Sequence, residues 1–238
     1  MSLSSFFSRL FGHGGVKLPT GAPTFVDTFV NLDNWIVSTW TAPQNGIAQV
    51  SSFQADHVAI NVGFPGLSLI LDQLLLPNTT VQSIGGEVQS KQKFGYGVYE
   101  WIAMAGGNVN GLSVAGGVTG LFNFINNSET EIDFEVEGQS PTLVDLTNYS
   151  GITQATTGKY TTIDLTKTWH SYKFFWTAKQ ITWFLDGKQI RQATLNIPTV
   201  PAFVMMNHWG TNNRNFGGLA TPGVSRSMHV QRFSFTPA

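Results

Sequence analysis

The chain of 238 residues carries few charges: charged residues make up 11% of it, the formal net charge is −1, and it contains no Cys. A hydrophobic share of 42% excludes intrinsic disorder, which requires low hydrophobicity and high charge. Thirteen basic residues in no cluster argue against a nucleic-acid partner. The lack of Cys excludes a disulfide framework and a thiolate metal site. No apolar run approaches the roughly 20 residues of a transmembrane helix, so we expect no membrane span.

Residues 1–20 differ from the rest of the chain. Apolar residues recur there at helical spacing, but Ser8 and Arg9 interrupt the apolar region that a signal peptide requires, and no small-residue cleavage site follows. We therefore expect an N-terminal tail or a short amphipathic segment over residues 1–20, with a peripheral docking segment as the alternative. Residues 21–238 are expected to form one domain.

Beyond residue 20 the hydrophobic pattern has a period of two, which predicts β-strands. Residues 48–53, 97–102, 171–176 and 180–185 are rich in β-branched and aromatic residues and are separated by Gly, Asn, Pro and Ser. Asp186-Gly187 lies between two such runs and predicts a tight hairpin. Many short strands in one repeat-free segment predict an all-β domain, a β-jelly-roll sandwich of two antiparallel sheets.

The segment 129–138 contains five of the fourteen acidic residues. On a strand these acids project from one face and Ile132, Phe134 and Val136 from the other. Neighbouring carboxylates raise one another's pKa, which suits a general acid beside an ionised nucleophile. The alternatives are an acidic solvent face or a divalent-cation site, although calcium prefers ligands from a curved loop. The five acids of this row are Glu129, Glu131, Asp133, Glu135 and Glu137.

Residues 131–135 match the E-x-D-x-E signature of glycoside hydrolase family 16, the lichenase and laminarinase clan, in its unbulged form. Further blocks resemble the family's motifs in the family's order and extend the resemblance over about residues 24–236. These blocks lie at 26–35, 86–100, 169–176, 181–187, 196–198 and 205–209.

The resemblance implies that both sheets are curved, with the acidic strand in a concave substrate cleft. Position by position it makes Glu131 the nucleophile, Glu135 the general acid and base, and Asp133 the assisting carboxylate between them. The implied activity is endo-acting, retaining hydrolysis of a β-1,3-1,4- or β-1,3-linked β-glucan. Retaining enzymes hold the two carboxyl groups about 5–5.5 Å apart. Residues i and i+4 of a strand lie roughly 13 Å apart at Cα, so the two side chains must lean together over a bent strand.

The resemblance also places side chains against the sugar. A Trp ring stacks on a pyranose face and an amide binds hydroxyl groups; core packing is the alternative for Trp209 and an ordinary surface charge for Glu87. The histidines His170 and His208 are expected to be buried. The predicted substrate-binding residues are Glu87, Asn207, Trp209, Tyr149 and Tyr96, with Phe94 as a further groove candidate.

Three positions depart from the family pattern. Glu129 stands where lichenases usually carry an aromatic residue, and Gln89 stands where an arginine is common, which leaves the exact linkage open. Gln231 stands at the position of a calcium-binding aspartate in many members. We therefore expect no metal and no cofactor, with a structural calcium as the less favoured case.

Three other functions remain open at this point. A sugar hydroxyl that outcompetes water would make the same residues a transglycosylase. A non-catalytic glycan-binding module would need the aromatic residues but not the paired carboxylates. A cation-stabilised structural protein is the third alternative, and the ordered family blocks argue against it more strongly. We expect a monomer whose partner is a polysaccharide and which acts extracellularly or on a cell wall. The route of export stays open, because no ordinary signal peptide is visible.

Overall fold

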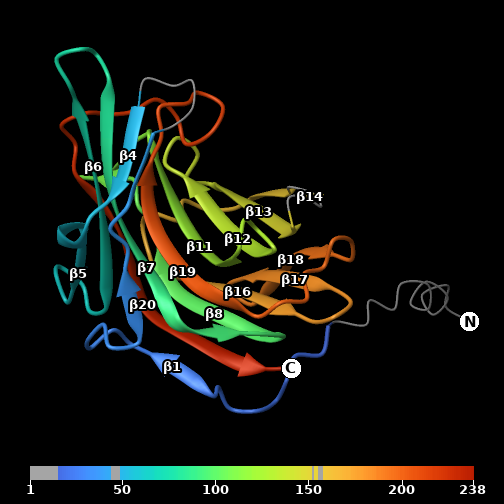
Figure 1. The fold of residues 1–238 in the computed structure, drawn as a ribbon. Helices are drawn as coiled ribbons and strands as arrows, with labels where there is room; N and C mark the ends of the chain where they lie inside the picture. The colour runs from blue at the N-terminus through green and yellow to red at the C-terminus, as the bar shows by residue number, and fades with distance from the viewer. Residues whose placement is uncertain (1–15, 44–48, 152, 155–157) are drawn as a thin grey trace, which may run out of the picture.

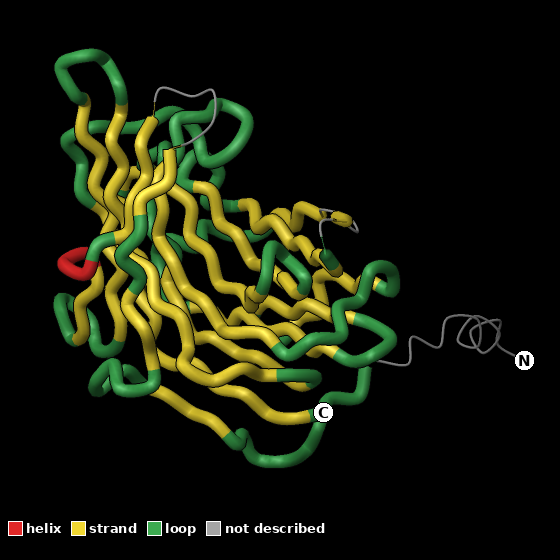
Figure 2. The backbone as a smooth tube through the Cα atoms, in the orientation of Figure 1, coloured by secondary structure: helices red, strands yellow, loops and turns green. Residues whose placement is uncertain are grey.

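The computed structural model describes residues 16–43, 49–151, 153–154 and 158–238. The prediction for residues 1–20 therefore falls mostly outside the described residues. Two curved β-sheets pack face to face (Figure 1). Helical structure in the described residues is confined to one 3₁₀ turn, η1 (Ala55–His57), and strands make up most of the trace (Figure 2). The predicted all-β jelly roll is confirmed.

The first sheet, called the cleft sheet, carries the acidic strand at its centre. Its order is β2, β7, β19, β11, β12 and β13, with β14 and β15 both paired to β13. All of these pairings are antiparallel. The strand bounds are β2 (Trp35–Val37), β7 (Val81–Phe94), β19 (Ala202–Gly210), β11 (Gly117–Ile125), β12 (Thr130–Glu137), β13 (Leu143–Ser150), β14 (Thr153–Gln154) and β15 (Gly158–Thr161).

The second sheet, called the outer sheet, runs β18, β17, β16, β8 and β20. Strands β1 and β6 pair with different parts of β20, and β5 pairs with β6. The bounds are β18 (Lys188–Ala193), β17 (Ile181–Leu185), β16 (His170–Trp176), β8 (Gly97–Met104), β20 (Arg226–Pro237), β1 (Phe25–Asp27), β6 (Leu67–Leu75) and β5 (Val58–Ile60).

Strand β7 is long enough to belong to both sheets. Residues 81–85 pair with β6 and, in parallel, with β4 (Gln49–Phe53), whereas residues 86–94 pair with β19. Strand β3 (Thr41–Pro43) pairs with β4, and β9 (Asn108–Val109) forms a small hairpin with β10 (Leu112–Ser113). The β4–β7 pair is the parallel exception to the predicted antiparallel sheets.

The predicted strands and hairpin are present. Asp186 and Gly187 both have positive φ, at 50° and 78°, and join β17 to β18 through the pair Leu185 and Lys188. A two-residue turn with positive φ at both positions matches the twist of the flanking strands, which is why Asp-Gly favours it.

Aromatic side chains fill the space between the two sheets. Tyr99 and Trp101 of β8 are fully buried. From the cleft sheet, Phe134 meets Tyr172 edge to face at 5.5 Å between ring centroids. The indole N–H of Trp183 in the outer sheet donates to the carbonyl of Asp133 at 3.1 Å. The outer sheet thus holds the acidic strand from behind by packing and by one directional hydrogen bond.

Candidate active site

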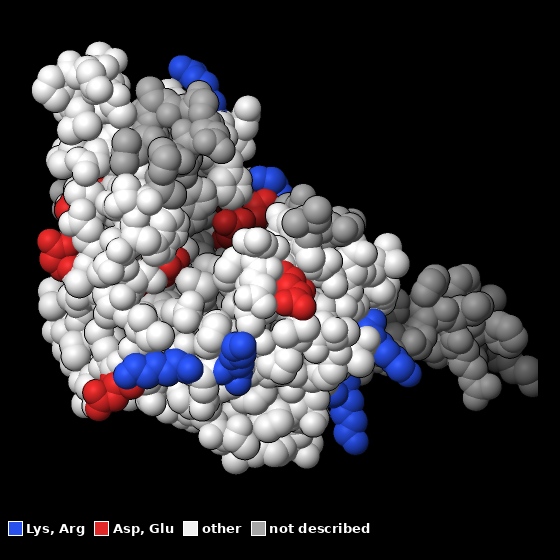
Figure 3. All heavy atoms as spheres, in the orientation of Figure 1, with Lys and Arg blue, Asp and Glu red and all other residues white. Residues whose placement is uncertain are grey.

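A groove crosses the cleft sheet as two adjoining hollows, and Glu131 lines both. On the face drawn in Figure 3, carboxylate atoms lie inside a recess of a largely uncharged surface. The first hollow, of about 520 Å³, is called the aromatic hollow; its side chains include Trp40, Phe53, Glu87, Gln89, Phe122, Phe124, Met205, Asn207 and Trp209. The second, of about 440 Å³, is called the acid hollow; beside Glu131 it is lined by Asp133, Glu135, Asp145, Thr147, Tyr149, Lys159, Asn215 and Phe216.

Strand β12 presents its carboxylates to the groove because it is held in regular register on both sides. Its Glu135 pairs with Gly120 of β11 and with Asp145 of β13. The opposite face, made of Ile132, Phe134 and Val136, is buried in the core, as the alternation predicts. Both hollows together therefore receive Glu131, Asp133 and Glu135 from one strand face.

Glu129 does not belong to this row. It precedes β12, it is exposed, and it accepts a hydrogen bond at 3.0 Å from the side-chain amide of Asn126. The prediction that it projects with the other acids is wrong because the chain is still in the β11–β12 turn at this position. Glu137 does lie within β12, and its partners are described below.

The same turn supplies a hydrogen bond to Glu131. Asn126, Asn127 and Ser128 all have positive φ, at 45°, 50° and 62°, a conformation that Asn tolerates better than most residues. The turn brings the Ser128 hydroxyl close to Glu131, to which it donates a hydrogen bond. Burial raises the pKa of Glu131, and the hydrogen bond from Ser128 opposes that rise. Ser128 thus favours the ionised form, which is the form a nucleophile needs.

Glu135 and Asp133 are pushed further toward their protonated forms. Burial, followed by the charges of Asp145, Glu131 and Glu137, raises the pKa of Glu135 to about 8, and Lys159 partly opposes this. Burial and the charges of Glu131 and Glu135 hold the pKa of Asp133 well above its usual range. At neutral pH, Glu135 therefore retains a proton that it can donate. The hydrogen bond from Ser128 favours the ionised form of Glu131, whereas the surroundings of Glu135 favour its protonated form, a combination that a general acid beside a nucleophile requires.

The floor of the aromatic hollow is polar. The side-chain amide of Asn207 donates to Glu87 at 2.9 Å, and the indole N–H of Trp40 donates to the other oxygen of Glu87 at 3.2 Å. Burial raises the pKa of Glu87, while hydrogen bonds from Asn207, Ser38 and Trp40 oppose the rise. The predicted pair Glu87 and Asn207 is thus brought together, on neighbouring strands β7 and β19.

Gly120 separates this floor from the acid hollow. It pairs with Asn207 on one side and with Glu135 on the other. A Cβ at this position would lie 2.4 Å from Oδ1 of Asn207. The absence of a side chain at Gly120 therefore leaves room for the amide of Asn207 beside it.

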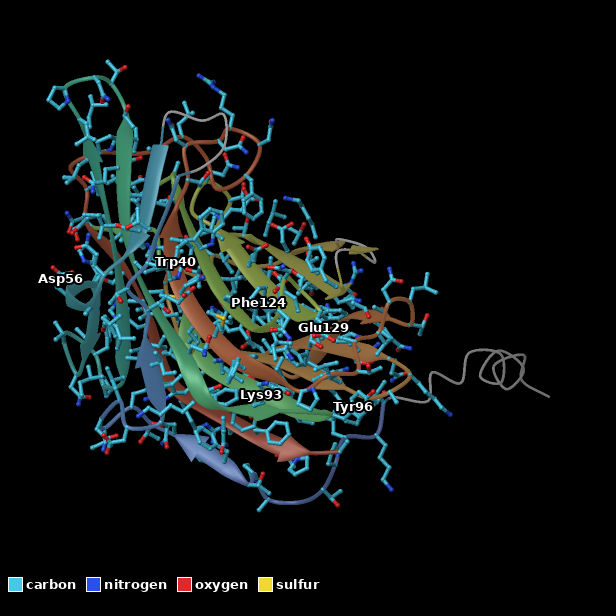
Figure 4. The ribbon with its side chains drawn as sticks, viewed as in Figure 1. Trp40, Asp56, Lys93, Tyr96, Phe124 and Glu129 are labelled. Atoms are coloured by element: carbon cyan, nitrogen blue, oxygen red, sulfur yellow. The ribbon has the colours of Figure 1, made fainter. Side chains whose placement is uncertain are left out.

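The structure places the predicted aromatic residues in different locations. Trp209 lines the aromatic hollow and stacks on Phe216 at 5.9 Å between centroids, and Tyr149 lines the acid hollow. Tyr96 reaches neither hollow: its ring packs edge to face on Trp176 at 5.0 Å, against the core. Figure 4 shows Tyr96 well apart from Trp40 and Phe124. Phe94 is likewise buried in the core, so neither residue lines the groove as predicted.

Several groove residues were not identified from the sequence. Phe122 and Phe124 stand two apart on β11, a spacing that signals one face but does not say which face is the groove. Trp40 lies between the short strands β2 and β3, and Ser128 lies in the turn before β12. No periodic pattern marks residues in such places. No sequence pattern marks Lys159 and Asp145 as groove residues, because they are brought together by the pairing of β13 with β15.

The two histidines that were expected to be buried, His170 and His208, are buried. His170 pairs through Nδ1 with Asp186 at 2.8 Å, away from the groove. His208 is also buried; burial and the nearby Arg226 lower its pKa to about 3, so it stays neutral. Neither acts as an acid or base on a substrate in the groove.

The residues around Gln231 do not fit a calcium ion. This exposed amide lines a hollow on the outer sheet together with Thr28, Asn61 and Arg232. The guanidinium of Arg232 pairs there with Glu100 at 3.3 Å. Calcium prefers several oxygen ligands including carboxylates, and this hollow is lined by amide and hydroxyl groups beside a fixed positive charge. Among the residues that the structure describes, no group of three or more His, Asp or Glu is placed to hold a metal.

Fold and site together define a jelly-roll protein with a carboxylate-bearing strand across a groove. Comparison with known proteins agrees. The family model for glycosyl hydrolases family 16 matches residues 47–222. The chain is 32% identical to a beta-glucanase of Bacillus subtilis over 217 residues, which cover 87% of this chain and 83% of that protein. It is 31% identical to a beta-glucanase of Acetivibrio thermocellus over 188 residues, which cover 78% of this chain and 54% of that protein.

Solved structures share the fold. The Bacillus licheniformis beta-glucanase superimposes with a TM-score of 0.78 at 24% identity, covering 92% of this chain and all of that one. A β-1,3-1,4-glucanase (lichenase) derived from a mouse hindgut metagenome gives a TM-score of 0.76 at 23% identity, covering 90% of this chain and 99% of that one. The chain belongs to glycosyl hydrolases family 16, and it spans about half the length of the Acetivibrio relatives that it matches.

Proposed function

We propose that this chain is an endo-acting, retaining glycoside hydrolase that cleaves a β-glucan with β-1,3-1,4 or β-1,3 linkages. The observation that carries the proposal is the pair Glu131 and Glu135 on one strand face in the groove. Their environments differ: Ser128 donates a hydrogen bond to Glu131, whereas the pKa of Glu135 is raised to about 8. Such a difference supports Glu131 as the nucleophile and Glu135 as the proton donor.

In the first step a carboxylate oxygen of Glu131 attacks the anomeric carbon, and the bond to the glycosidic oxygen breaks. The leaving oxygen takes the proton of Glu135, which gives a glycosyl ester on Glu131 and an ionised Glu135. In the second step a water molecule attacks the same carbon and gives its proton to Glu135, and Glu131 leaves as a carboxylate. One water is consumed in each cycle, and two inversions retain the anomeric configuration.

Asp133 assists between these two residues. Its buried carboxyl interacts electrostatically with both Glu131 and Glu135, and burial together with these two charges holds its pKa well above its usual range, which favours the protonated form. A protonated Asp133 is a hydrogen-bond donor for Glu131 and adds no further negative charge while the ester forms and breaks.

The substrate class follows from the groove and from the relatives. The aromatic hollow offers ring faces from Trp40, Phe122 and Trp209 and amide groups to a neutral sugar, with Glu87 as its main charge beside Glu131. Several relatives are named beta-glucanase, and one structural neighbour is a laminarinase catalytic domain of Thermotoga petrophila. A neutral β-glucan suits both the aromatic and amide lining of this hollow and these names.

Further parts of the proposal concern partners and location. The described residues include no helix with the length and apolar character that crossing a bilayer requires. We propose that the enzyme works as a monomer, without a cofactor or metal, on a polysaccharide outside the cytoplasm or in a cell wall. The location is proposed because the substrate is a polysaccharide. The absence of a cofactor and of a second subunit is proposed because the carboxylates of one chain and a water molecule are enough for both steps.

The test is reducing-end release from barley β-glucan, laminarin, xyloglucan and agarose by the wild type and by Glu131→Gln. We expect rapid release of oligosaccharides from barley β-glucan or laminarin, and a loss of about 10⁴-fold or more in Glu131→Gln, since the covalent step then lacks its nucleophile. Glu129→Gln is the matched control and should behave as the wild type. Activity on none of the four polysaccharides, or an unimpaired Glu131→Gln variant, would refute the proposed function.

A further inference from the structure

The fourth acid of the row, Glu137, is buried and takes no part in the steps above. Its carboxylate accepts hydrogen bonds from three groups on different segments. Lys159 of β15 donates at 2.9 Å, the side-chain amide of Gln139 at 2.6 Å, and the backbone N–H of Gly217 at 2.6 Å. These bonds join β12 to β15 and to the loop Thr211–Gly218.

Lys159 makes a second ion pair on the same side of the groove. Its ammonium lies 3.1 Å from Asp145, which is buried in β13 opposite Glu135. Burial alone would raise the pKa of Glu137, but its hydrogen bonds, led by that from Lys159, bring it below its usual value. Glu137 is therefore ionised at neutral pH, and Lys159 is shared between two acids.

The loop that Glu137 holds also contributes to the groove. Asn215 and Phe216 line the acid hollow, and Phe216 stacks on Trp209 of the aromatic hollow. Gly217 has a φ of 74°, and a Cβ there would lie 2.1 Å from the side chain of Thr211. The loop is thus folded tightly against β11 and β19, and its contact with the catalytic strand is the bond from Gly217 to Glu137.

We propose that Glu137, Lys159 and Asp145 form a charged clamp that positions the loop Thr211–Gly218 over the proton-donor side of the groove and fixes the charge that surrounds Glu135. The three are positioning residues, since they act through Glu135 and the loop. The charged groups that face Glu135 are Glu131 and Glu137 on its own strand, Asp145 on β13 and Lys159 on β15, and Asp133 lies between Glu131 and Glu135. This proposal rests on the proposed function for its kinetic test but not for its structural one.

The kinetic test compares the alkaline limb of the pH profile of kcat/KM on a β-glucan. Lys159→Met removes a positive charge near Glu135, so its proton is held more tightly and the limb should move up by about 0.5–1 pH unit. Glu137→Gln removes a negative charge, so the limb should move down by a similar amount. Lys159→Arg should restore the limb to its wild-type position. Glu129→Gln and Lys188→Met are matched charge-removal controls outside the clamp, and neither should move it.

The structural test is amide hydrogen exchange of the wild type and of Glu137→Leu, without substrate. Leu fills the buried site but accepts no hydrogen bond, so protection of residues 211–218 should fall at least about tenfold, with β16 and β17 unchanged. Unchanged protection of the loop in Glu137→Leu would overturn the clamp even if the chain had no glucanase activity. The clamp would also be overturned if the alkaline limb of the pH profile stayed in place in Lys159→Met and Glu137→Gln, or if it moved in the same direction in both variants. An inactive wild type with a clamped loop would refute only the proposed function.

Discussion

The two hollows of the groove lie on the same sheet but differ in the side chains that line them. The aromatic hollow is lined by five aromatic side chains among polar ones, with Glu87 held by Asn207 and Trp40 on its floor. The acid hollow gathers four acids and one lysine in a smaller space. Both are built from alternate residues of neighbouring strands, so the difference lies in which residues the sequence places on that face. We infer that the first hollow holds sugar rings and the second performs the proton transfer and the covalent step.

Among the substitutions that distinguish the two hollows, we expect the largest loss of activity from Glu135→Gln in the acid hollow. Loss of the proton donor should lower kcat on a polysaccharide by about 10²–10⁴-fold with little change in KM, because the general acid acts in the transition state. On an aryl glycoside with a good leaving group the loss of kcat/KM, which reports the first step, should be much smaller, since that oxygen needs no proton. An equal loss on both substrates would contradict the assignment. Initial rates on the two substrates provide the measurement.

Gly120→Ala should disturb the boundary between the hollows. The added methyl group meets Oδ1 of Asn207 at 2.4 Å, so Asn207 must turn away from Glu87 or the strands must separate. We expect kcat/KM to fall by about 10–100-fold, since one misplaced groove contact commonly costs on the order of 1–3 kcal/mol. Gly21→Ala, where a Cβ meets nothing within 4 Å, is the matched control. Wild-type kinetics in Gly120→Ala would show that Asn207 does not contact the sugar.

Trp40→Ala tests the aromatic hollow alone. Trp40 contributes a half-exposed ring and one hydrogen bond to Glu87, and it lies outside the acid hollow. We expect KM to rise by about tenfold with kcat nearly unchanged, because a ring contact of about 0.5–1.5 kcal/mol holds the ground state and the transition state alike. The exposed Phe64, in the turn between β5 and β6, offers the control Phe64→Ala. A selective loss of kcat in Trp40→Ala would contradict the division between the hollows.

Ser128→Ala should give the smallest effect, a shift at one end of the pH profile. The Ser128 hydroxyl lowers the pKa of Glu131, so its removal raises that pKa. The nucleophile must be ionised, so the acidic limb of kcat/KM should move up by about one pH unit or less while the alkaline limb stays in place. Ser128→Thr keeps the hydroxyl and should preserve the limb. Movement of the alkaline limb instead would exchange the roles of Glu131 and Glu135.

The sequence predicts the fold and the catalytic strand well, for physical reasons. Alternation of Ile132, Phe134 and Val136 with acids marks a strand with one buried face, and Asp186-Gly187 marks the hairpin between β17 and β18. These signals are local, and the structure agrees with them. The same alternation misleads at Glu129, because a period of two does not show where a strand begins.

Residues brought in by distant pairing are predicted least well. Tyr96 is of a residue type that often binds sugars. However, it comes after the end of the long strand β7, outside the groove, and packs on Trp176. Lys159 and Phe216 reach the acid hollow only through the β13–β15 pairing and the loop after β19. Their positions depend on contacts between residues far apart in sequence, which a one-dimensional pattern does not contain.

The central claim is that Glu131 and Glu135 act together in a double displacement. Proton NMR of the first products released from a β-glucan measures this directly, because the anomeric proton reports its configuration before mutarotation. A retaining pair predicts that the β anomer appears first and that the α anomer grows in later. Initial release of the α anomer would mean a single displacement by water, and it would contradict the assignment of Glu131 as the nucleophile.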